Sequence, residues 1–428
     1  MTATGGSPAG AYWGNYPMFV KHAQLAAKSI LGLAAAGVLV PAAGAQQLVR
    51  LRLPQIAPTR EVTAFARPPI HVVTTADLSA PPTSAFTPAM IRHAYGFDLV
   101  ANQGAGQTIA VIDAYDDANI ESDLATFSSQ FGLPACSSAT GCFTKLYATG
   151  SQPSASAQWT IETALDVEWA HAIAPQANII LVEANSYALS DLLVAVDLAV
   201  TKGASVVSMS WTTSEFSGER SMDTHFLATG VTFLAASGDS GAGVNYPAAS
   251  PDVISVGGTS LTLNAQQNYQ SEAAWSGSGG GVSAYENEPV FQEQFGVPND
   301  PGGYRVVPDV SLDANPGTGF AVYNSIPYQN AEGWFQVGGT SASTPQWAAA
   351  IAIVNSMRAA AHKASYSGAA APLYPMNTRL DSLTFNPINR PAATDCRMVC
   401  HSIAGYDIFT GLGSPQVKNL IPTLVARP

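Results

Sequence analysis

The residue with the clearest chemical potential is Ser341, in the segment from Gly338 to Pro345. A glycine turn precedes it, and the apolar run Trp347–Val354 that follows predicts a helix. Pro345 fits the first turn of such a helix. A helix N-terminus has unpaired N–H groups and a partial positive charge, which favour a hydroxyl that passes through an anionic state. The alternative is an N-cap serine, the commoner role at such a position.

A serine nucleophile needs a base, and the sequence offers a carboxylate pair. Glu162 and Asp166 are four residues apart in a predicted helix over Thr160–Ala174, so they share one face. The helix is otherwise apolar or aromatic, without a lysine or arginine nearby in the sequence. Carboxylates held together in an apolar setting share a proton, and one titrates abnormally high. Such a pair suits a base that works in acid, whereas the alternative is a solvated acidic face.

Asp239 is a third candidate, in the segment Ser237–Gly241 after the predicted strand Val231–Ala236. An aspartate among small residues usually caps its own turn, and this is the favoured interpretation of the residue alone. Alternatively, its protonated form donates a hydrogen bond to a developing oxyanion.

Histidine is the most common base for a serine, but none here lies in a glycine-flanked loop of the kind that often carries a catalytic histidine. His22 falls in an expected targeting signal. The other six are interpreted as surface or packed residues: His71, His93, His171, His225, His362 and His401.

The N-terminus predicts export. Lys21 and Lys28 precede the apolar run Ile30–Val40, and Ala43–Ala45 is a small-residue cleavage site, so residues 1–45 are expected to be a signal peptide. The mature protein is then secreted or periplasmic. No other segment is apolar over the roughly 20 residues that a membrane span needs. A net charge of −12 argues against a nucleic-acid partner, and we expect a monomer.

The four cysteines fit an oxidising compartment. Cys136 and Cys142 lie close in sequence, as do Cys396 and Cys400, and two local disulfides need the least long-range ordering of the three possible connectivities. A zinc site is the alternative, but neither pair has Cys-x-x-Cys spacing.

The chain is divided at about residue 88. Residues 46–87 are rich in Pro, Ala and Thr and are predicted to form an extended leader or short pro-segment. From residue 88 to 428, predicted strands alternate with predicted helices. The strands are Gln107–Asp113, Ala177–Glu183, Ser205–Trp211, Val231–Ala236 and Val253–Val256. This alternation predicts one α/β domain with a mostly parallel sheet flanked by helices in three layers.

Together these segments resemble the sedolisin family, the serine-carboxyl peptidases, whose fold is subtilisin-like. The resemblance runs from about Phe86 to Val425. It is carried in order by Val111–Asp117, the Glu162…Asp166 helix, Ala174-Pro175, Ser208–Trp211, Ser237–Gly241, Val256–Thr259, Pro308–Val310, Gly338–Pro345, Gly405–Asp407 and Thr410–Pro415.

The resemblance implies a role for each candidate. Ser341 would be the nucleophile, Glu162 the general base, and Asp166 the partner that orients Glu162 and tunes its pKa. Protonated Asp239 would complete the oxyanion hole with backbone N–H groups. The implied reaction is acyl transfer to Ser341 and hydrolysis of the acyl-enzyme, in acid because Asp239 must stay protonated to donate.

The resemblance also implies supporting residues. Asp113 and Trp211 would lie near the carboxylate pair. The stretch Ser278–Ser283, and within it Ser278, Gly279, Gly280 and Gly281, would pair with an extended polypeptide substrate as an added strand.

Two departures from the family stand out. Only about 45 residues separate the signal from the match, where the family usually has a large N-terminal prodomain. At the expected calcium site, Pro387 replaces an aspartate, leaving Asp407 and the carbonyls of Ile388 and Gly405. Calcium is therefore an open expectation, and a disulfide of the second cysteine pair would replace some of the cross-linking by the ion.

The leading hypothesis is a secreted, acid-acting endopeptidase. A non-catalytic peptide-binding homologue on the same fold is the main alternative, suggested by the two departures. An esterase or amidase is the third, although Ser341 lacks the Gly-x-Ser-x-Gly elbow of an α/β-hydrolase.

Overall fold

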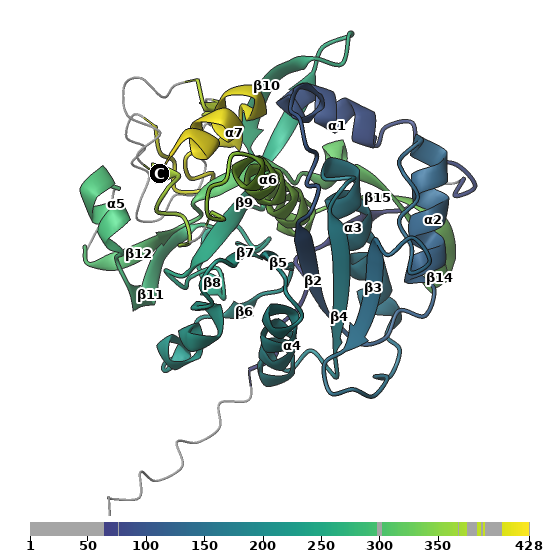
Figure 1. The fold of residues 1–428 in the computed structure, drawn as a ribbon, viewed down its shortest axis with the longest axis horizontal. Coiled ribbons are helices and arrows are strands. Elements are labelled where there is room, and N and C mark those ends of the chain that lie inside the picture. Colours follow the sequence, from purple (N-terminus) through teal and green to yellow (C-terminus); the bar gives the residue numbers. More distant parts are fainter. Residues whose placement is uncertain are drawn as a thin grey trace, which may run out of the picture. The chain divides into compact units, whose positions relative to one another are not determined.

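A nine-stranded sheet forms the centre of the computed structural model (Figure 1). The structure describes residues 64–75, 77–297, 302–366, 368–374, 383–386, 388–389 and 405–427. The strand order is β17-β10-β9-β7-β5-β2-β4-β3, and β13 pairs with β9. The strands from β3 to β9 are parallel, whereas β10 is antiparallel to β9. The predicted α/β class with a mostly parallel sheet is confirmed.

The strands of this sheet are β2 (Thr108–Ala114), β3 (Phe143–Tyr147), β4 (Asn178–Ala184), β5 (Val206–Met209), β7 (Thr232–Ala236), β9 (Val253–Leu263), β10 (Tyr269–Ala274), β13 (Val310–Asp313) and β17 (Ile388–Asn389). The smaller sheets consist of β1 (His71–Val73), β15 (Ala331–Gly338) and β14 (Phe320–Tyr328); β11 (Gly281–Asn287) and β12 (Tyr304–Val307); β6 (Thr213–Ser214) and β8 (Asn245–Tyr246); and β16 (Phe385–Asn386) and β18 (Ser414–Pro415).

The α-helices are α1 (Pro88–Tyr95), α2 (Ile120–Phe131), α3 (Ala157–Ile173), α4 (Leu189–Thr201), α5 (Val290–Phe295), α6 (Thr340–Ala360) and α7 (Val417–Ala426). Three short 3₁₀ segments are η1 (Phe97–Leu99), η2 (Glu219–Phe226) and η3 (Pro316–Thr318). Within the described residues, no helix is both long and apolar enough to cross a membrane.

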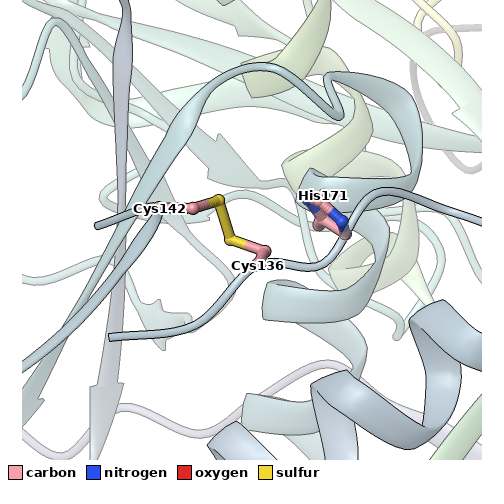
Figure 2. Close-up of side chains that lie close together, drawn as sticks. All are labelled: Cys136, Cys142 and His171. Atoms are coloured by element: carbon pink, nitrogen blue, oxygen red, sulfur yellow. A yellow bond between two sulfur atoms is a disulfide. The ribbon is translucent and has the colours of Figure 1, made fainter. Parts of the chain in front are cut away.

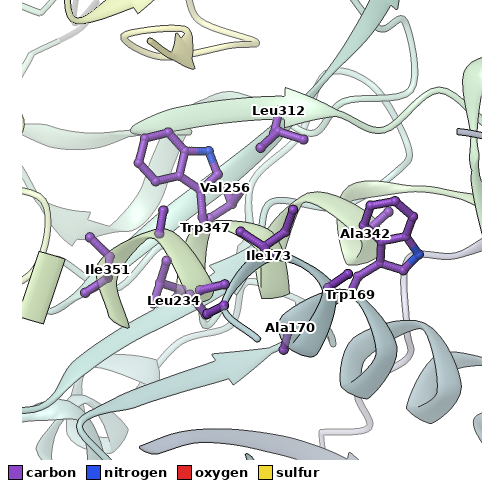
Figure 3. Packing of buried hydrophobic residues seen from close by; sticks show 14 of the residues in the cluster. Trp169, Ala170, Ile173, Leu234, Val256, Leu312, Ala342, Trp347 and Ile351 are labelled. Carbon is purple, nitrogen blue, oxygen red and sulfur yellow. The ribbon is translucent and has the colours of Figure 1, made fainter. Parts of the chain in front are cut away.

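The central strands bury both faces, and alternate residues serve different cores. Ile109 and Val111 of β2 belong to one cluster and Ala110 and Ile112 to the other, as the two-residue period of a strand requires. Helices α3 and α6 pack together on the first face, and α4 covers the second. Figure 3 shows Trp169 and Trp347 of the two first-face helices within this core.

Helix α3 is buried along almost its whole length, with every residue from Trp159 to Ile173 inaccessible or nearly so. A helix that is apolar on all sides can only occupy the interior. Its two candidate carboxylates, Glu162 and Asp166, are therefore carried into the core, so the alternative of a solvated acidic face is wrong.

Helix α6 begins at Thr340 after Gly339, whose φ of 113° suits glycine. Ser341 is its second residue, as predicted. Pro345 is the sixth residue rather than part of the first turn, which corrects that expectation. Because Pro345 has no N–H, the carbonyl of Ser341 loses the hydrogen bond that residue 345 would otherwise donate.

The described residues before α1 belong to the same compact unit as the rest of the domain, so this unit does not begin at Pro88. Residues 46–63 lie outside the described part, but residues 64–73 are extended, as the sequence predicts, and are hydrogen-bonded to the domain. β1 pairs antiparallel with β15, His71 opposite Gly338 and Val73 opposite Gln336. The sequence gives no sign of the pairing between β1 and β15, because the free edge of β15 exists only in the folded chain. The predicted signal, residues 1–45, also lies outside the described residues.

Candidate active site

Ser341 lies at the buried N-terminus of α6, and its side chain is fully inaccessible. Its hydroxyl has no hydrogen-bond partner among the described residues. The neighbouring Glu162 carboxyl is close enough that the hydroxyl lowers its pKa, although no hydrogen bond joins them. A catalytic hydroxyl and its base are often separated in this way before substrate is bound.

Three buried carboxyls converge beside the serine. Glu162 and Asp166 project from α3, and Asp113 comes from β2 close to the carboxyl end of that strand. All three are inaccessible, and each interacts electrostatically with at least one of the others. Both oxygens of Glu162 and of Asp113, and Oδ2 of Asp166, lack hydrogen-bond partners among the described residues.

Burial is the main reason that these groups resist ionisation. It raises the pKa of Glu162 and of Asp166 well above their usual values, and the negative charges of neighbouring carboxyls raise both further. Burial likewise raises the pKa of Asp113 to about 7. The cluster therefore holds protons in acid and releases them in steps that belong to the group as a whole.

Ser210, which follows β5, joins the carboxylate cluster to the serine helix. Its Oγ lies 2.8 Å from Oδ1 of Asp166 and 3.3 Å from the carbonyl oxygen of Ser341. That carbonyl is the one that Pro345 leaves without its helical partner. The sequence places Ser210 in a family segment but gives no sign of this bridge, which depends on how β5 and α6 meet.

Trp211 is hydrogen-bonded to the strand that carries Asp113. It is fully buried, and its indole N–H donates to the carbonyl oxygen of Ile112 at 3.0 Å. Ile112 is next to Asp113 in β2, so the ring connects the segment after β5 to the strand that carries this carboxyl.

Asp239 lies at the N-terminus of α6, next to the residue that precedes Ser341. Its Oδ1 accepts hydrogen bonds from the backbone N–H and the hydroxyl of Thr340, both at 2.8 Å. Burial raises its pKa, which favours the protonated form that can donate to an oxyanion. A Cβ on Gly339 would come within 2.6 Å of Oδ2, so the close approach requires glycine there.

The chain's own segment 64–73 lies across this site. The backbone N–H of Ser341 donates to the carbonyl oxygen of Pro69 at 3.3 Å, and His71 Nε2 lies 3.2 Å from Oδ2 of Asp239. The sequence interpretation of His71 as a surface or packed residue missed this contact. No pattern could have found it, because the strand that carries it reaches Asp239 only through its pairing with β15.

The glycine stretch expected to bind substrate is packed against the domain itself. Ser278 Oγ bonds with the N–H of Gly258 and donates to the carbonyl of Phe409, while the N–H of Gly279 donates to Gly238. A Cβ on Gly280 would lie 2.1 Å from the carbonyl oxygen of Ile408. Gly281 begins β11 and pairs with Val307.

The residues expected to hold calcium are only partly described. Asp407 is buried, and its Oδ1 accepts the N–H of Phe409 at 2.9 Å. Gly405 has a φ of 95°, and Ile388 lies in β17. Pro387 lies outside the described residues, as does the second cysteine pair, Cys396 and Cys400.

The first cysteine pair forms the predicted disulfide. Cys136 and Cys142 are bonded, and His171 of α3 is close by (Figure 2). The sulfur and nitrogen atoms of the three residues lie within 4.8 Å of one another. The disulfide uses both thiols, and His171 Nε2 donates to the carbonyl oxygen of Pro134 at 2.8 Å, so this is a structural staple.

Known proteins have similar sequences. Residues 148–371 match the subtilase family. Kumamolisin of Bacillus sp. (strain MN-32) is 33% identical over 81% of this chain, and sedolisin of Pseudomonas sp. (strain 101) is 27% identical over 66%. The chain spans 65% of the first relative's length and 49% of the second's. Human tripeptidyl-peptidase 1 is 31% identical over 46% of this chain and 38% of its own length.

A solved structure is similar as well. It is that of Pseudomonas sedolisin, a serine-carboxyl proteinase, complexed with two molecules of pseudo-iodotyrostatin. The match has a TM-score of 0.68 and 25% identity, and it covers 79% of this chain and 97% of the solved one. The subtilisin-like fold expected from the sequence is thereby confirmed.

Proposed function

The chain belongs to the subtilase family and, within it, to the sedolisins, and from this we propose that it is a serine-carboxyl endopeptidase that works in acid. The observation that supports this most is the buried hydroxyl of Ser341 beside three buried carboxyls, Glu162, Asp166 and Asp113, of whose six oxygens only Oδ1 of Asp166 accepts a hydrogen bond among the described residues. Unpaired buried carboxyls are costly to the fold, which favours a chemical role for them.

The proposed reaction begins with Ser341. Its Oγ attacks the carbonyl carbon of a peptide bond while its proton passes to Glu162, which must be the ionised member of the carboxyl cluster while its neighbours hold the shared protons. Asp166 is hydrogen-bonded to Ser210. It keeps Glu162 in place and shares a proton with it. The oxyanion accepts hydrogen bonds from the Ser341 N–H and from protonated Asp239. Glu162 then gives its proton to the leaving amine, and water hydrolyses the acyl-enzyme by the same steps in reverse.

The endopeptidase mode is supported by how an extended chain lies in the site. The five residues directly before Pro69, residues 64–68, are extended. They form backbone hydrogen bonds to the segments around Tyr187 and Thr212. In an enzyme that removes tripeptides, the substrate cleft must be closed beyond the third residue before the cleaved bond. Here the upstream path continues further, so we propose cleavage within polypeptides.

Secretion is part of the proposal and is supported by the signal-like N-terminus and by the disulfide between Cys136 and Cys142. Calcium at the Asp407 loop also stays a prediction. A buried carboxylate with the carbonyls of Ile388 and Gly405 is an all-oxygen donor set of the kind that calcium prefers, and the ion would cross-link this loop. Adding a chelator would then lower the melting temperature, and excess calcium would restore it.

The decisive experiment is degradation of a denatured protein by the purified chain at about pH 4 and about pH 7. We expect activity in acid only, and loss of about 10⁴-fold or more in Ser341→Ala. A serine-directed phosphonate should label the wild type in acid and leave Ser341→Ala unlabelled. Folded protein that binds peptides without cutting them or reacting with the probe would favour the binding-protein alternative, and cleavage of esters alone would favour an esterase.

A further inference from the structure

Cys136, Cys142 and His171 form a second group of reactive side chains, outside the carboxyl cluster beside Ser341 (Figure 2). Their two sulfur atoms and a ring nitrogen of the histidine all lie within 4.8 Å of one another. In the oxidised chain the sulfurs are bonded to each other and staple the loop before β3. Two thiolates and an imidazole are, however, also the ligand types that zinc selects in proteins.

His171 has the hydrogen-bonding pattern of a metal ligand. Because the carbonyl oxygen of Pro134 can only accept, Nε2 of His171 must carry the proton in their 2.8 Å hydrogen bond, which leaves Nδ1 with a lone pair. Nδ1 has no hydrogen-bond partner within the part of the chain that the structure describes, although the side chain is fully inaccessible. A histidine that binds a metal through one nitrogen commonly donates the N–H of the other to such a carbonyl.

Burial also keeps this imidazole neutral. It lowers the pKa of His171, and the opposing effect of the hydrogen bond to Pro134 is smaller. The neutral ring is the form that binds a cation. A buried lone pair without a partner costs free energy, and a bound cation would supply the partner that is missing here.

The backbone holds the two cysteines close together by contacts other than the S–S bond. The N–H of Phe143 donates to the carbonyl oxygen of Ser137 at 3.2 Å, and the N–H of Ile179 donates to that of Cys142 at 2.7 Å. The Cα atoms of Cys136 and Cys142 are 5.0 Å apart. Two thiolates on a tetrahedral zinc ion, each about 2.3 Å from it, are about 3.8 Å apart, which side-chain rotation reaches from these backbone positions.

The group is open to solvent on the side of the loop. Cys142 is partly exposed and Pro134 and Ala135 are exposed, whereas Cys136 and His171 are buried. Three protein ligands leave one position of a tetrahedral ion free, and water would reach that position from the loop side.

We propose that Cys136, Cys142 and His171 form a zinc site with two states: a disulfide when oxidised and, after reduction, the three protein ligands of one zinc ion. The ion would replace the cross-link that reduction removes and would tie the loop before β3 to helix α3, which carries His171. This inference does not depend on the proposed function, because none of the three residues takes part in the proposed reaction.

The exchange needs a dithiol as the reductant. One thiolate of the dithiol attacks a protein sulfur and the Cys136–Cys142 bond breaks; the second thiolate then displaces the mixed disulfide. Two electrons and two protons pass to the protein, which gains two thiols, and the dithiol becomes a cyclic disulfide. Zinc binds both sulfurs as thiolates and releases their two protons to water, without a change in its own oxidation state.

The test measures zinc binding by the full chain. Ser341→Ala prevents proteolysis, and Cys396→Ser with Cys400→Ser leaves the first cysteine pair alone to respond to reduction. Calorimetric titration with zinc at about pH 7.5 compares the oxidised chain with chain reduced by a dithiol that is then removed under nitrogen. We expect the reduced chain to bind close to one equivalent of zinc more than the oxidised chain.

His171→Gln in the same background removes the ring nitrogen and keeps a donor for Pro134. It should weaken zinc binding by the reduced chain about 100-fold or more, since the loss even of a group that only orients a ligand costs about 10–100-fold. His93→Gln is the matched control and should bind zinc unchanged, because His93 is an exposed histidine paired with Asp98 at 2.9 Å elsewhere.

X-ray absorption at the zinc edge identifies the ligands without relying on a variant that must fold. We expect two sulfur neighbours at about 2.3 Å and nitrogen or oxygen neighbours at about 2.0–2.1 Å. Zinc without sulfur neighbours overturns the inference, as does equal binding by oxidised and reduced chain, or a folded His171→Gln that binds as tightly as its parent. Each of these outcomes leaves the proposed peptidase function standing, because Ser341 plays no part in them.

Discussion

Among the regions of this protein that bury carboxylates, two do so in opposite ways. Between β12 and β13, Asp309 is inaccessible, yet both of its oxygens are used. Arg305 donates to them at 2.8 and 2.6 Å, and Tyr374 and the N–H of Ser255 add bonds at 2.7 and 2.8 Å. The charge is neutralised and the hydrogen bonds are satisfied, as a structural ion pair requires.

The carboxyls beside Ser341 have no such support. Among the described residues, no lysine or arginine forms an ion pair with Glu162, Asp166 or Asp113, and five of their six oxygens accept nothing. Both regions are equally inaccessible to water, so burial alone does not distinguish them. The difference lies in the partners: Asp309 has a cation and a partner for each oxygen, whereas the carboxyls beside Ser341 have no cation and few hydrogen bonds.

The largest effect should come from Glu162→Gln, which keeps the shape of the side chain and removes the base. We expect kcat/KM to fall by about 10³–10⁴-fold, because the proton of Ser341 then has no acceptor. The stability should be unchanged or higher, since a buried acid is lost. Kinetics in acid and urea unfolding test this. If the variant lost stability together with activity, Glu162 would be a structural residue like Asp309, which would contradict this comparison.

Arg305→Met should have the reverse result. It leaves the Asp309 carboxylate buried without its cation, and we expect the free energy of unfolding to fall by about 3–5 kcal/mol. Adding Asp309→Leu should recover much of the loss, because the unpaired charge is removed as well. Urea unfolding of both variants in a Ser341→Ala background, where self-cleavage cannot interfere, gives the comparison. No recovery in the double variant would mean that packing, not charge, holds this region.

A smaller effect should appear in the pH dependence of stability. Burial raises the pKa of Asp113 to about 7 in the folded chain, above its unfolded value, so the folded state holds a proton that the unfolded state has released. Stability from this group is present below the unfolded pKa and is lost as the pH rises through about 7. Asp113→Asn should therefore reduce the difference in unfolding free energy between about pH 5 and about pH 8 by roughly 2 kcal/mol. An unchanged difference would contradict the raised pKa.

The smallest effect is expected from Ser210→Ala. It removes the hydroxyl between Asp166 and the carbonyl of Ser341, and we expect kcat to fall by about tenfold. The acid limb of the pH profile should also shift, because Asp166 loses its hydrogen bond. Ser208→Ala is the control: Ser208 is equally buried, and its hydroxyl has no partner among the described residues. Equal effects of the two changes would make Ser210 a packing residue only.

Much of the fold follows from local sequence. Strand β2 and helix α3 were predictable because their apolar periods and lengths leave few alternatives, and the alternation of strands with helices sets the parallel sheet. The glycine turn before Ser341 predicted where α6 begins. The sequence did not predict that Pro345 lies beyond the first turn of this helix, because helix boundaries depend on packing as well as on capping.

The sequence by itself determined which residues could react, since their types and their spacing along α3 and α6 are local properties. Ser341, Glu162 and Asp166 became candidates in this way, whereas the catalytic role of Asp239 was expected only from the family resemblance. Tertiary structure decided what surrounds them. Ser210 meets Asp166 across 44 positions of sequence, and His71 meets Asp239 across 168. Such contacts depend on strand pairing and on which carboxylates the fold leaves without a cation, and no local pattern records either.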